Sequence, residues 1–153
     1  MKIRIELYQE QEDDEVIIRC RELNDTVKRI QDAIASFAGT KRTIVLYHGE
    51  VECYVDVEDI LFFETMSNGM TAHTRDNVYQ AKYRLYELEE MLPGYFLRIS
   101  KSAIINVREV FSLSRSNLST TSVVAFSQSN KQVFVSRHYI GQLKEKLKEM
   151  RMR

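Results

Sequence analysis

The chain has 153 residues, of which 44% are hydrophobic and 29% are charged, and its formal net charge at pH 7 is zero. This length and composition are typical of one globular domain, or of one domain with a small appendage, and they exclude a disordered chain. No apolar run approaches the ~20 residues that span a bilayer, and the N-terminus lacks the apolar core of a signal peptide. Cys20 and Cys53 lie in unrelated segments. We therefore expect reduced thiols in a cytoplasmic protein rather than a disulfide or a metal pair.

The zero net charge conceals a strong separation of charge along the chain. Residues 1–40 have a net charge of −3, residues 41–92 of −5 and residues 93–153 of +8. A basic segment of this size favours a polyanionic partner on one face of the molecule. A basic C-terminal helix that is merely solvated has the same composition, and charge alone leaves the two interpretations even.

The first 40 residues predict a small ββα unit. Alternating apolar residues indicate strands over residues 2–8 and 15–21, joined by an acidic hairpin loop. Asn24 and Asp25 are suited to cap a following helix. Its apolar face is expected to hold Val27, Ile30, Ile34 and Phe37.

The acidic pair Asp13–Asp14 in that loop fits a solvated hairpin tip better than a phosphoacceptor or a cation site. No third ligand and no lysine partner follow at loop spacing. Forty residues are also too few for a receiver domain. A signal received as phosphate on the N-terminal segment is therefore not expected.

Short strands joined by turns rich in Gly, Asn and Ser predominate from residue 43 onward. Two helical patterns interrupt them, one from Gln80 to Leu92 before Pro93–Gly94, and one that begins at Ser136. The last helix is expected to bury Ile140, Leu143, Leu147 and Met150. Because strands outnumber helices and follow each other as hairpins, we predict a mostly β (α+β) fold with antiparallel sheets.

The sequence lacks the motifs of the common enzyme classes, including phosphate-binding glycine loops, nucleophile elbows and zinc-protease helices. His48, His73 and His138 lie in separate segments, and none has a second candidate ligand at metal-site spacing. The acidic pairs Glu58–Asp59 and Glu89–Glu90 are interpreted as solvated surface rather than as general acid and base. We therefore expect no enzyme activity, no cofactor and no metal.

Two short polar segments stand out instead. Ser100, Lys101 and Ser102 separate two apolar strands and offer an ammonium and two hydroxyls with little bulk, groups that hold phosphate oxygens. Arg137 and His138 follow at the start of the last helix, where an arginine can bond guanine O6 and N7 together. The alternative for the second segment is a serine N-cap followed by two solvated basic residues.

Three separated motifs occur in a fixed order: DILFFET (59–65), FLRISKSAIIN (96–106) and VSRHY (135–139), with LYELEE between the first two. In this combination residues 43–147 resemble the LytTR family of DNA-binding domains. The resemblance implies an elongated, mostly β domain with two helices over residues 41–153. The ββα unit predicted above, over residues 1–40, precedes it. It also implies that double-stranded DNA is read through loops and not through a helix lying in the groove.

In the family, two loops enter successive major grooves and a third lies over the intervening backbone and minor groove. Carried onto this chain, the first loop is residues 66–70, the middle one is Ser100–Lys101 and the last is Arg137–His138. The resemblance and the chemistry together give these expected DNA-binding residues: Asn68, Ser100, Lys101, Ser102, Arg137 and His138.

The first loop departs from the family pattern. Many members have a histidine or another polar reader late in this loop, where the present chain has Gly69 and Met70. Asn68 has the donor and acceptor to bond adenine bidentately. The alternative is that Asn68 only shapes the turn beside Gly69.

Most family members are output domains fused to a receiver, and stand-alone members resemble regulators that a membrane-bound partner protein controls. The acidic N-terminal half offers a surface for such a partner, and a packing or dimerising appendage is an equal alternative. The expected function is a sequence-specific transcriptional regulator that reads repeated sites as a homodimer. The alternative is an interaction module, or an antagonist of another regulator, that does not bind DNA.

Overall fold

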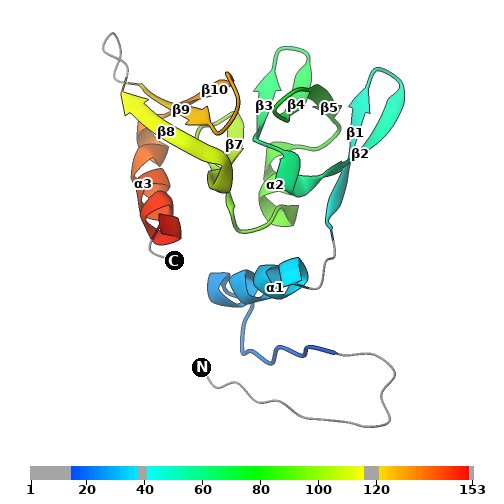
Figure 1. The fold of residues 1–153 in the computed structure, drawn as a ribbon, viewed down its shortest axis with the longest axis vertical. Helices are drawn as coiled ribbons and strands as arrows, with labels where there is room; N and C mark the ends of the chain where they lie inside the picture. Colours follow the sequence, from blue (N-terminus) through cyan, green and yellow to red (C-terminus); the bar gives the residue numbers. More distant parts are fainter. Residues whose placement is uncertain (1–14, 38–40, 116–120, 152–153) are drawn as a thin grey trace.

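The computed structural model describes residues 15–37, 41–115 and 121–151, and these residues form two β-sheets and three α-helices (Figure 1). The larger sheet has seven strands in the order β2-β1-β5-β4-β3-β7-β6, and the smaller has three in the order β10-β9-β8. The strands of the larger sheet are β1 (Thr43–His48), β2 (Val51–Asp56), β3 (Phe62–Met66), β4 (Gly69–His73), β5 (Val78–Ala81), β6 (Phe96–Arg98) and β7 (Ala103–Asn106). Those of the smaller sheet are β8 (Val110–Arg115), β9 (Ser122–Phe126) and β10 (Gln132–Val135). The pairings are antiparallel, which confirms the predicted mainly β fold.

The helices are α1 (Asp25–Phe37), α2 (Leu85–Met91) and α3 (Arg137–Arg151), and two short 3-10 turns, η1 and η2, lie at Val57–Asp59 and Val107–Glu109. In the described part of the chain no helix has the length and apolar character needed to cross a membrane. Figure 1 shows α1 at the opposite end of the molecule from the turn between β3 and β4.

Strand β7 and the first two residues of β3 are buried on both faces and divide the interior into two clusters. Phe62 pairs with Ile105, and both belong to the cluster that includes the small sheet and Leu143 of α3. Phe63 pairs with Ile104, and both belong to the cluster that includes β1 and Leu88 of α2. Successive side chains of a strand point to opposite faces. The continuous apolar runs in these two strands therefore supply both cores at once.

The second predicted helix is shorter than the sequence pattern indicated. Ala81 ends strand β5, where it pairs with Met70, and the helix begins only at Leu85. The Glu87 carboxylate accepts a hydrogen bond from the Arg84 backbone N–H at 3.0 Å, which favours a helix start at this position. The prediction was wrong for the first turn because Ala81 fits the spacing of both a helix and the strand.

The N-terminal unit is observed only in part. The predicted strand at residues 2–8 and the pair Asp13–Asp14 lie outside the described residues. Residues 15–21 form no strand, and Val16 and Ile17 are each 63% exposed. A strand is stable only beside a partner strand, and the described residues supply none for this segment.

Helix α1 begins as predicted. Asn24 Oδ1 accepts a hydrogen bond from the Val27 backbone N–H at 3.1 Å, the geometry of an N-cap. Asp32 of α1 connects the helix to the rest of the chain: it accepts a bond from the Gly94 backbone N–H at 3.1 Å and pairs with Arg42 at 3.5 Å. The helix is therefore fastened to the domain by polar contacts.

Candidate nucleic-acid interface

The strand register places the three predicted loops at one end of the molecule. The turn between β3 and β4 follows Met66, and Glu64 of β3 pairs with Ala103, the first residue of β7. The segment Ser100–Ser102 directly precedes Ala103, so it lies beside that turn. The backbone N–H of Thr65 donates to the Ser102 carbonyl at 2.8 Å.

The start of α3 is joined to the same segment from its other side. The backbone N–H of Ser136 donates to the Ile99 carbonyl at 3.0 Å, just before Ser100. Hydrogen bonds at both ends of the middle loop thus connect it to the residue before the first loop, Thr65, and to the start of the last, Ser136. We call this part of the molecule the loop end; it comprises residues 66–70, 100–102 and 136–138.

The first loop is a tight hairpin whose tip is Ser67–Asn68. Met66 pairs with Gly69, which has a φ of 116°, a conformation that side-chain-bearing residues rarely adopt. Asn68 is exposed, whereas Met70 is only 9% exposed and packs in the α2-side core. Met70 therefore faces the interior, and the tip residues Ser67 and Asn68 are the polar side chains that this loop exposes.

The Arg98 side chain holds the backbone of the middle loop. Its Nε donates to the Ser100 carbonyl at 3.0 Å and its Nη2 to the Lys101 carbonyl at 2.9 Å, while Nη1 bonds Glu89 at 2.8 Å. These bonds fix the loop backbone, and they leave Lys101 exposed. Sequence reasoning missed this role, although an arginine inside the apolar run FLRIS was a signal that the position faces something polar.

The two serines of the middle loop partly satisfy each other. Ser100 Oγ accepts a bond from the Ser102 backbone N–H at 3.1 Å and lies 3.3 Å from Ser102 Oγ. Both are half-buried. They shape the loop, and each hydroxyl keeps capacity for a further bond because a hydroxyl both donates and accepts.

The last loop presents two basic side chains on the first turn of α3. Arg137 and His138 are both exposed, and the His138 ring meets the Tyr139 ring edge-on at 5.2 Å between centroids. Among the described residues, no carboxylate lies within ion-pair distance of Lys101 or Arg137. Cations without a carboxylate partner are available to phosphate oxygens or base edges.

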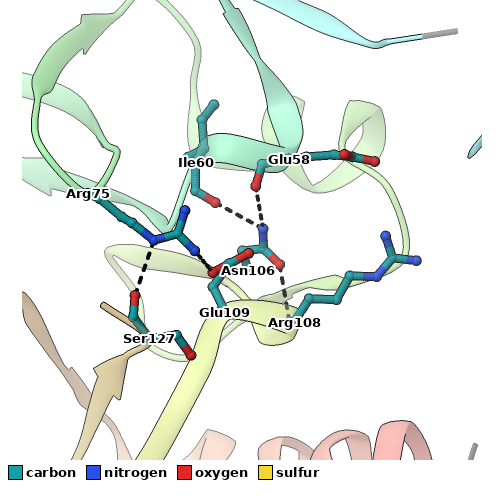
Figure 2. A network of polar contacts seen from close by, with 7 residues as sticks. All are labelled: Glu58, Ile60, Arg75, Asn106, Arg108, Glu109 and Ser127. Atoms are coloured by element: carbon teal, nitrogen blue, oxygen red, sulfur yellow. Dashed lines mark hydrogen bonds and ion pairs between the residues drawn. The ribbon is translucent and has the colours of Figure 1, made fainter. Parts of the chain in front are cut away.

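A buried amide fixes the joint between the two sheets. Asn106 is 1% exposed, and its Nδ2 donates to the Ile60 carbonyl at 3.0 Å, with the Glu58 carbonyl at 3.4 Å (Figure 2). Its Oδ1 accepts from the Arg108 backbone N–H at 3.1 Å. The amide therefore ties the end of β7 to the segment before β3 and to the 3-10 turn that leads into the small sheet.

Two cations complete this joint. Arg75, in the β4–β5 turn, bonds the Glu109 carboxylate and donates to the Ser127 carbonyl at 3.2 Å (Figure 2). Lys131 donates to the carbonyls of Thr74 and Asn77 at 2.7 and 2.8 Å. The β4–β5 turn and the small sheet are thus held together by charge-assisted hydrogen bonds.

The three histidines occupy different environments. His48 and His138 are exposed, while His73 is half-buried and stacks on Phe62 with 4.1 Å between ring centroids. Burial, and secondarily the Lys131 ammonium, lowers the pKa of His73 to about 4. Within the described ranges no group of three or more His, Cys, Asp or Glu is arranged to hold a metal ion.

The tautomer of His73 follows from its neighbour. The Thr71 hydroxyl donates to the Glu64 carbonyl at 2.9 Å, so Thr71 Oγ1, 3.1 Å from His73 Nε2, accepts the Nε2–H bond. His73 Nδ1 is buried and has no hydrogen-bond partner in the described structure. A proton on Nδ1 would therefore be buried without an acceptor, which agrees with the lowered pKa.

Sequence comparison identifies relatives along most of the chain. A protein of Staphylococcus aureus (strain bovine RF122 / ET3-1), described as an uncharacterised HTH-type transcriptional regulator, is 28% identical over 148 residues, covering 96% of this chain and 98% of that protein. One of strain MRSA252 with the same description is 32% identical over 106 residues, covering 69% of this chain and 71% of that protein. In the described part of the present chain, consecutive helices are separated by β-strands and do not form a helix-turn-helix.

The fold is shared with a solved structure. The LytTr DNA-binding domain of a response regulator from Bacillus cereus superposes with a TM-score of 0.62 at 22% identity, covering 71% of this chain and 98% of that domain. Residues 51–148, which contain the loops described above, match the LytTr DNA-binding domain family. The chain is a member of the LytTR family of DNA-binding domains.

Proposed function

We propose that this protein is a sequence-specific transcriptional regulator that binds double-stranded DNA through its loop end. The observation that carries the proposal is the hydrogen-bonded arrangement of the three loops: the Ser102 carbonyl bonds Thr65 beside the first loop, and the Ile99 carbonyl, just before Ser100, bonds Ser136. Three polar segments are held side by side on one scaffold. Such an arrangement suits a DNA duplex, whose phosphates and grooves recur along its axis.

The proposed roles of the side chains differ with their chemistry. Lys101 is a point charge on a flexible stem and is suited to phosphate. Arg137 has a planar fork that fits guanine O6 and N7, and Asn68 has the donor and acceptor that fit adenine N6 and N7. Ser100 and Ser102 shape the middle loop and bond phosphate oxygens, and His138 contacts a base or a phosphate next to Arg137.

We further propose that two copies bind adjacent repeats on the DNA. A loop-reading domain of this size contacts few base pairs, so a second copy on an adjacent site supplies the specificity that a regulator requires. Repeats separated by whole helical turns of ~10–10.5 bp place both copies on the same side of the duplex. Inserting half a turn between the repeats is expected to weaken binding more than inserting a full turn.

The alternative is an interaction module, or an antagonist of another regulator, that keeps this fold and pairs with that regulator without binding DNA. The exposed apolar residues Val16, Ile17 and Leu23 before α1 favour a protein partner at that end. The two functions use opposite ends of the molecule (Figure 1). They are therefore separable by substitution.

The test is a salt titration of binding to a random-sequence duplex and to a duplex enriched by the wild-type chain from a random library. We expect log affinity to fall with log salt, with a slope of about −0.9 for each contacted phosphate. Lys101→Ala is expected to weaken both duplexes equally and to reduce the steepness by about one unit. Arg137→Ala is expected to cost about 1–3 kcal/mol on the enriched duplex and much less on the random one.

Two outcomes would contradict the proposal. Failure of the library to enrich any sequence, together with a flat salt response, would exclude a DNA-binding regulator and favour the interaction module. Equal loss of specificity in Lys101→Ala and Arg137→Ala would contradict the division between positioning and reading. Lys28→Ala is the matched control, because Lys28 is exposed on α1 at the far end of the molecule.

A further inference from the structure

The connection between β5 and α2, residues 82–84, also lies at the loop end. Ala81 pairs with Met70, so continuing the antiparallel register by one residue places Lys82 across from Gly69. Gly69 directly follows the Ser67–Asn68 tip of the first loop. In the strand order, β5 lies beside β4 on the side away from β3 and β7. The connection thus extends the loop end beyond the first loop, away from the middle loop and α3.

Two cations of this connection are exposed: Lys82 and Arg84. Lys82 Nζ lies 4.0 Å from the centroid of the Tyr47 ring, which holds the ammonium near the sheet without neutralising its charge. No carboxylate among the described residues lies within ion-pair distance of either side chain. The nearby Glu87 carboxylate accepts its bond from the Arg84 backbone N–H.

Some cations at the other end of the molecule do have a carboxylate partner. Arg29 pairs with Glu149 at 2.5 Å, and Arg42 pairs with Asp32 at 3.5 Å. Lys82 and Arg84 therefore resemble Lys101 and Arg137 of the loop end, which also lack a carboxylate partner among the described residues. A duplex that crosses the three loops and continues past the first one would bring its backbone over this connection.

We infer that Lys82 and Arg84 form a further phosphate-binding position, which contacts the DNA backbone flanking the sequence that the first loop meets. The inference rests on the proposed DNA-binding function and adds an outer contact to it. Phosphate contacts carry no sequence information. This position therefore contributes affinity and length of footprint, and it does not contribute base preference.

The first experiment compares Lys82→Ala/Arg84→Ala with the wild type on a random-sequence duplex about three helical turns (~30 bp) long. We expect the log–log salt dependence to become less steep by ~0.9 for each phosphate that is no longer bound, close to two units in the double variant. The charge-conserving variant Lys82→Arg/Arg84→Lys should keep the wild-type slope. The matched control, Lys28→Ala/Arg151→Ala, removes one exposed charge from α1 and one from the C-terminal end of α3 and should also keep the wild-type slope.

The second experiment trims the enriched duplex from each end in turn. The wild type should lose affinity when the flank beside the first loop is removed, and Lys82→Ala/Arg84→Ala should be insensitive to the same truncation. Trimming the opposite flank should affect both proteins equally. A structural defect in the variant would lower affinity for every duplex and would not produce this selective insensitivity.

The results separate the inference from the function on which it rests. If the wild type binds and Lys101→Ala weakens binding, but the Lys82/Arg84 variant keeps the wild-type salt slope and truncation profile, the outer phosphate position is refuted and the DNA-binding function stands. If the wild type binds no duplex, the proposed function fails. A reduced slope in the control double variant equal to that of Lys82→Ala/Arg84→Ala would also refute the inference, because net charge alone would then explain the effect.

Discussion

Two regions of the molecule, the joint between the sheets on one hand and the loop end on the other, use similar polar residues in opposite ways. At the joint, the amide of Asn106 and the guanidinium of Arg75 have their bonds within the protein. At the loop end, Lys101 and Arg137 are exposed and have no carboxylate partner among the described residues. Polar groups satisfied inside the protein fix one geometry, whereas unpaired exposed charges remain available to a ligand.

Arg98 connects these two uses. It bonds Glu89 as a structural arginine does, and it also bonds the carbonyls of Ser100 and Lys101, which shapes the loop that presents Lys101. A basic residue within a motif is therefore not automatically a ligand contact. Its partners within the fold decide which use applies.

The largest effect that would test this comparison is expected at the joint. Asn106→Leu removes the partners of the buried Ile60 carbonyl and of the Arg108 N–H. Each unsatisfied buried group costs about 1–3 kcal/mol, so we expect unfolding free energy to fall by roughly 3 kcal/mol in chemical denaturation.

The matched control for this variant is Asn130→Leu, at an exposed asparagine in the turn before β10. Its effect should stay within about 0.5 kcal/mol. If both leucine variants unfolded at the same denaturant concentration, the buried amide would not be what holds the two sheets in place.

The sequence predicted the parts of this comparison that depend on local pattern. Alternation and turn residues located the strands from residue 43 onward, and the three motifs located the loop end. The sequence did not reveal that Met70 faces the interior or that Arg98 supports the middle loop. Both depend on pairing between segments that are distant along the chain, which a local period does not encode.

The segment at residues 15–21 shows that a local pattern can also predict an element that does not form. Its alternation is typical of a strand, yet strand formation requires a partner, and the described residues offer none. The sequence also did not reveal that the connection after β5 begins beside the first loop, because this follows from the β4–β5 register and not from any motif.

A smaller effect is expected at His73, a neutral group close to the charged joint. Its pKa is lowered to about 4 in the folded protein, below the ordinary value of 6.5, so the unfolded chain binds the proton more readily. Stability should therefore fall as the pH falls from about 6.5 towards 4. Because the ring is only half-buried, we expect this contribution to be about 1–2 kcal/mol.

His73→Phe tests this expectation. The Thr71 hydroxyl keeps its bond to the Glu64 carbonyl, and the ring stack on Phe62 is retained in shape. We expect the difference in unfolding free energy between pH 7 and pH 5, measured by denaturant titration, to be smaller in the variant. An unchanged pH profile would show that His73 is protonated in the folded protein without cost.

The smallest effect is expected where charges are paired but exposed, at the contact of α1 with the domain. The Arg29–Glu149 pair has side chains 37% and 43% exposed, so Arg29→Ala should cost at most about 0.5 kcal/mol.

Asp32 is better shielded, with a side chain 16% exposed, and it bonds both Arg42 and the Gly94 N–H, so Asp32→Ala should cost about 1 kcal/mol. Because α1 is held by such contacts, Asp32→Ala should speed hydrogen exchange of the α1 amides and leave the exchange of β3 and β7 unchanged. Faster exchange in β3 and β7 as well would show that α1 unfolds together with the domain and that its contacts belong with the joint.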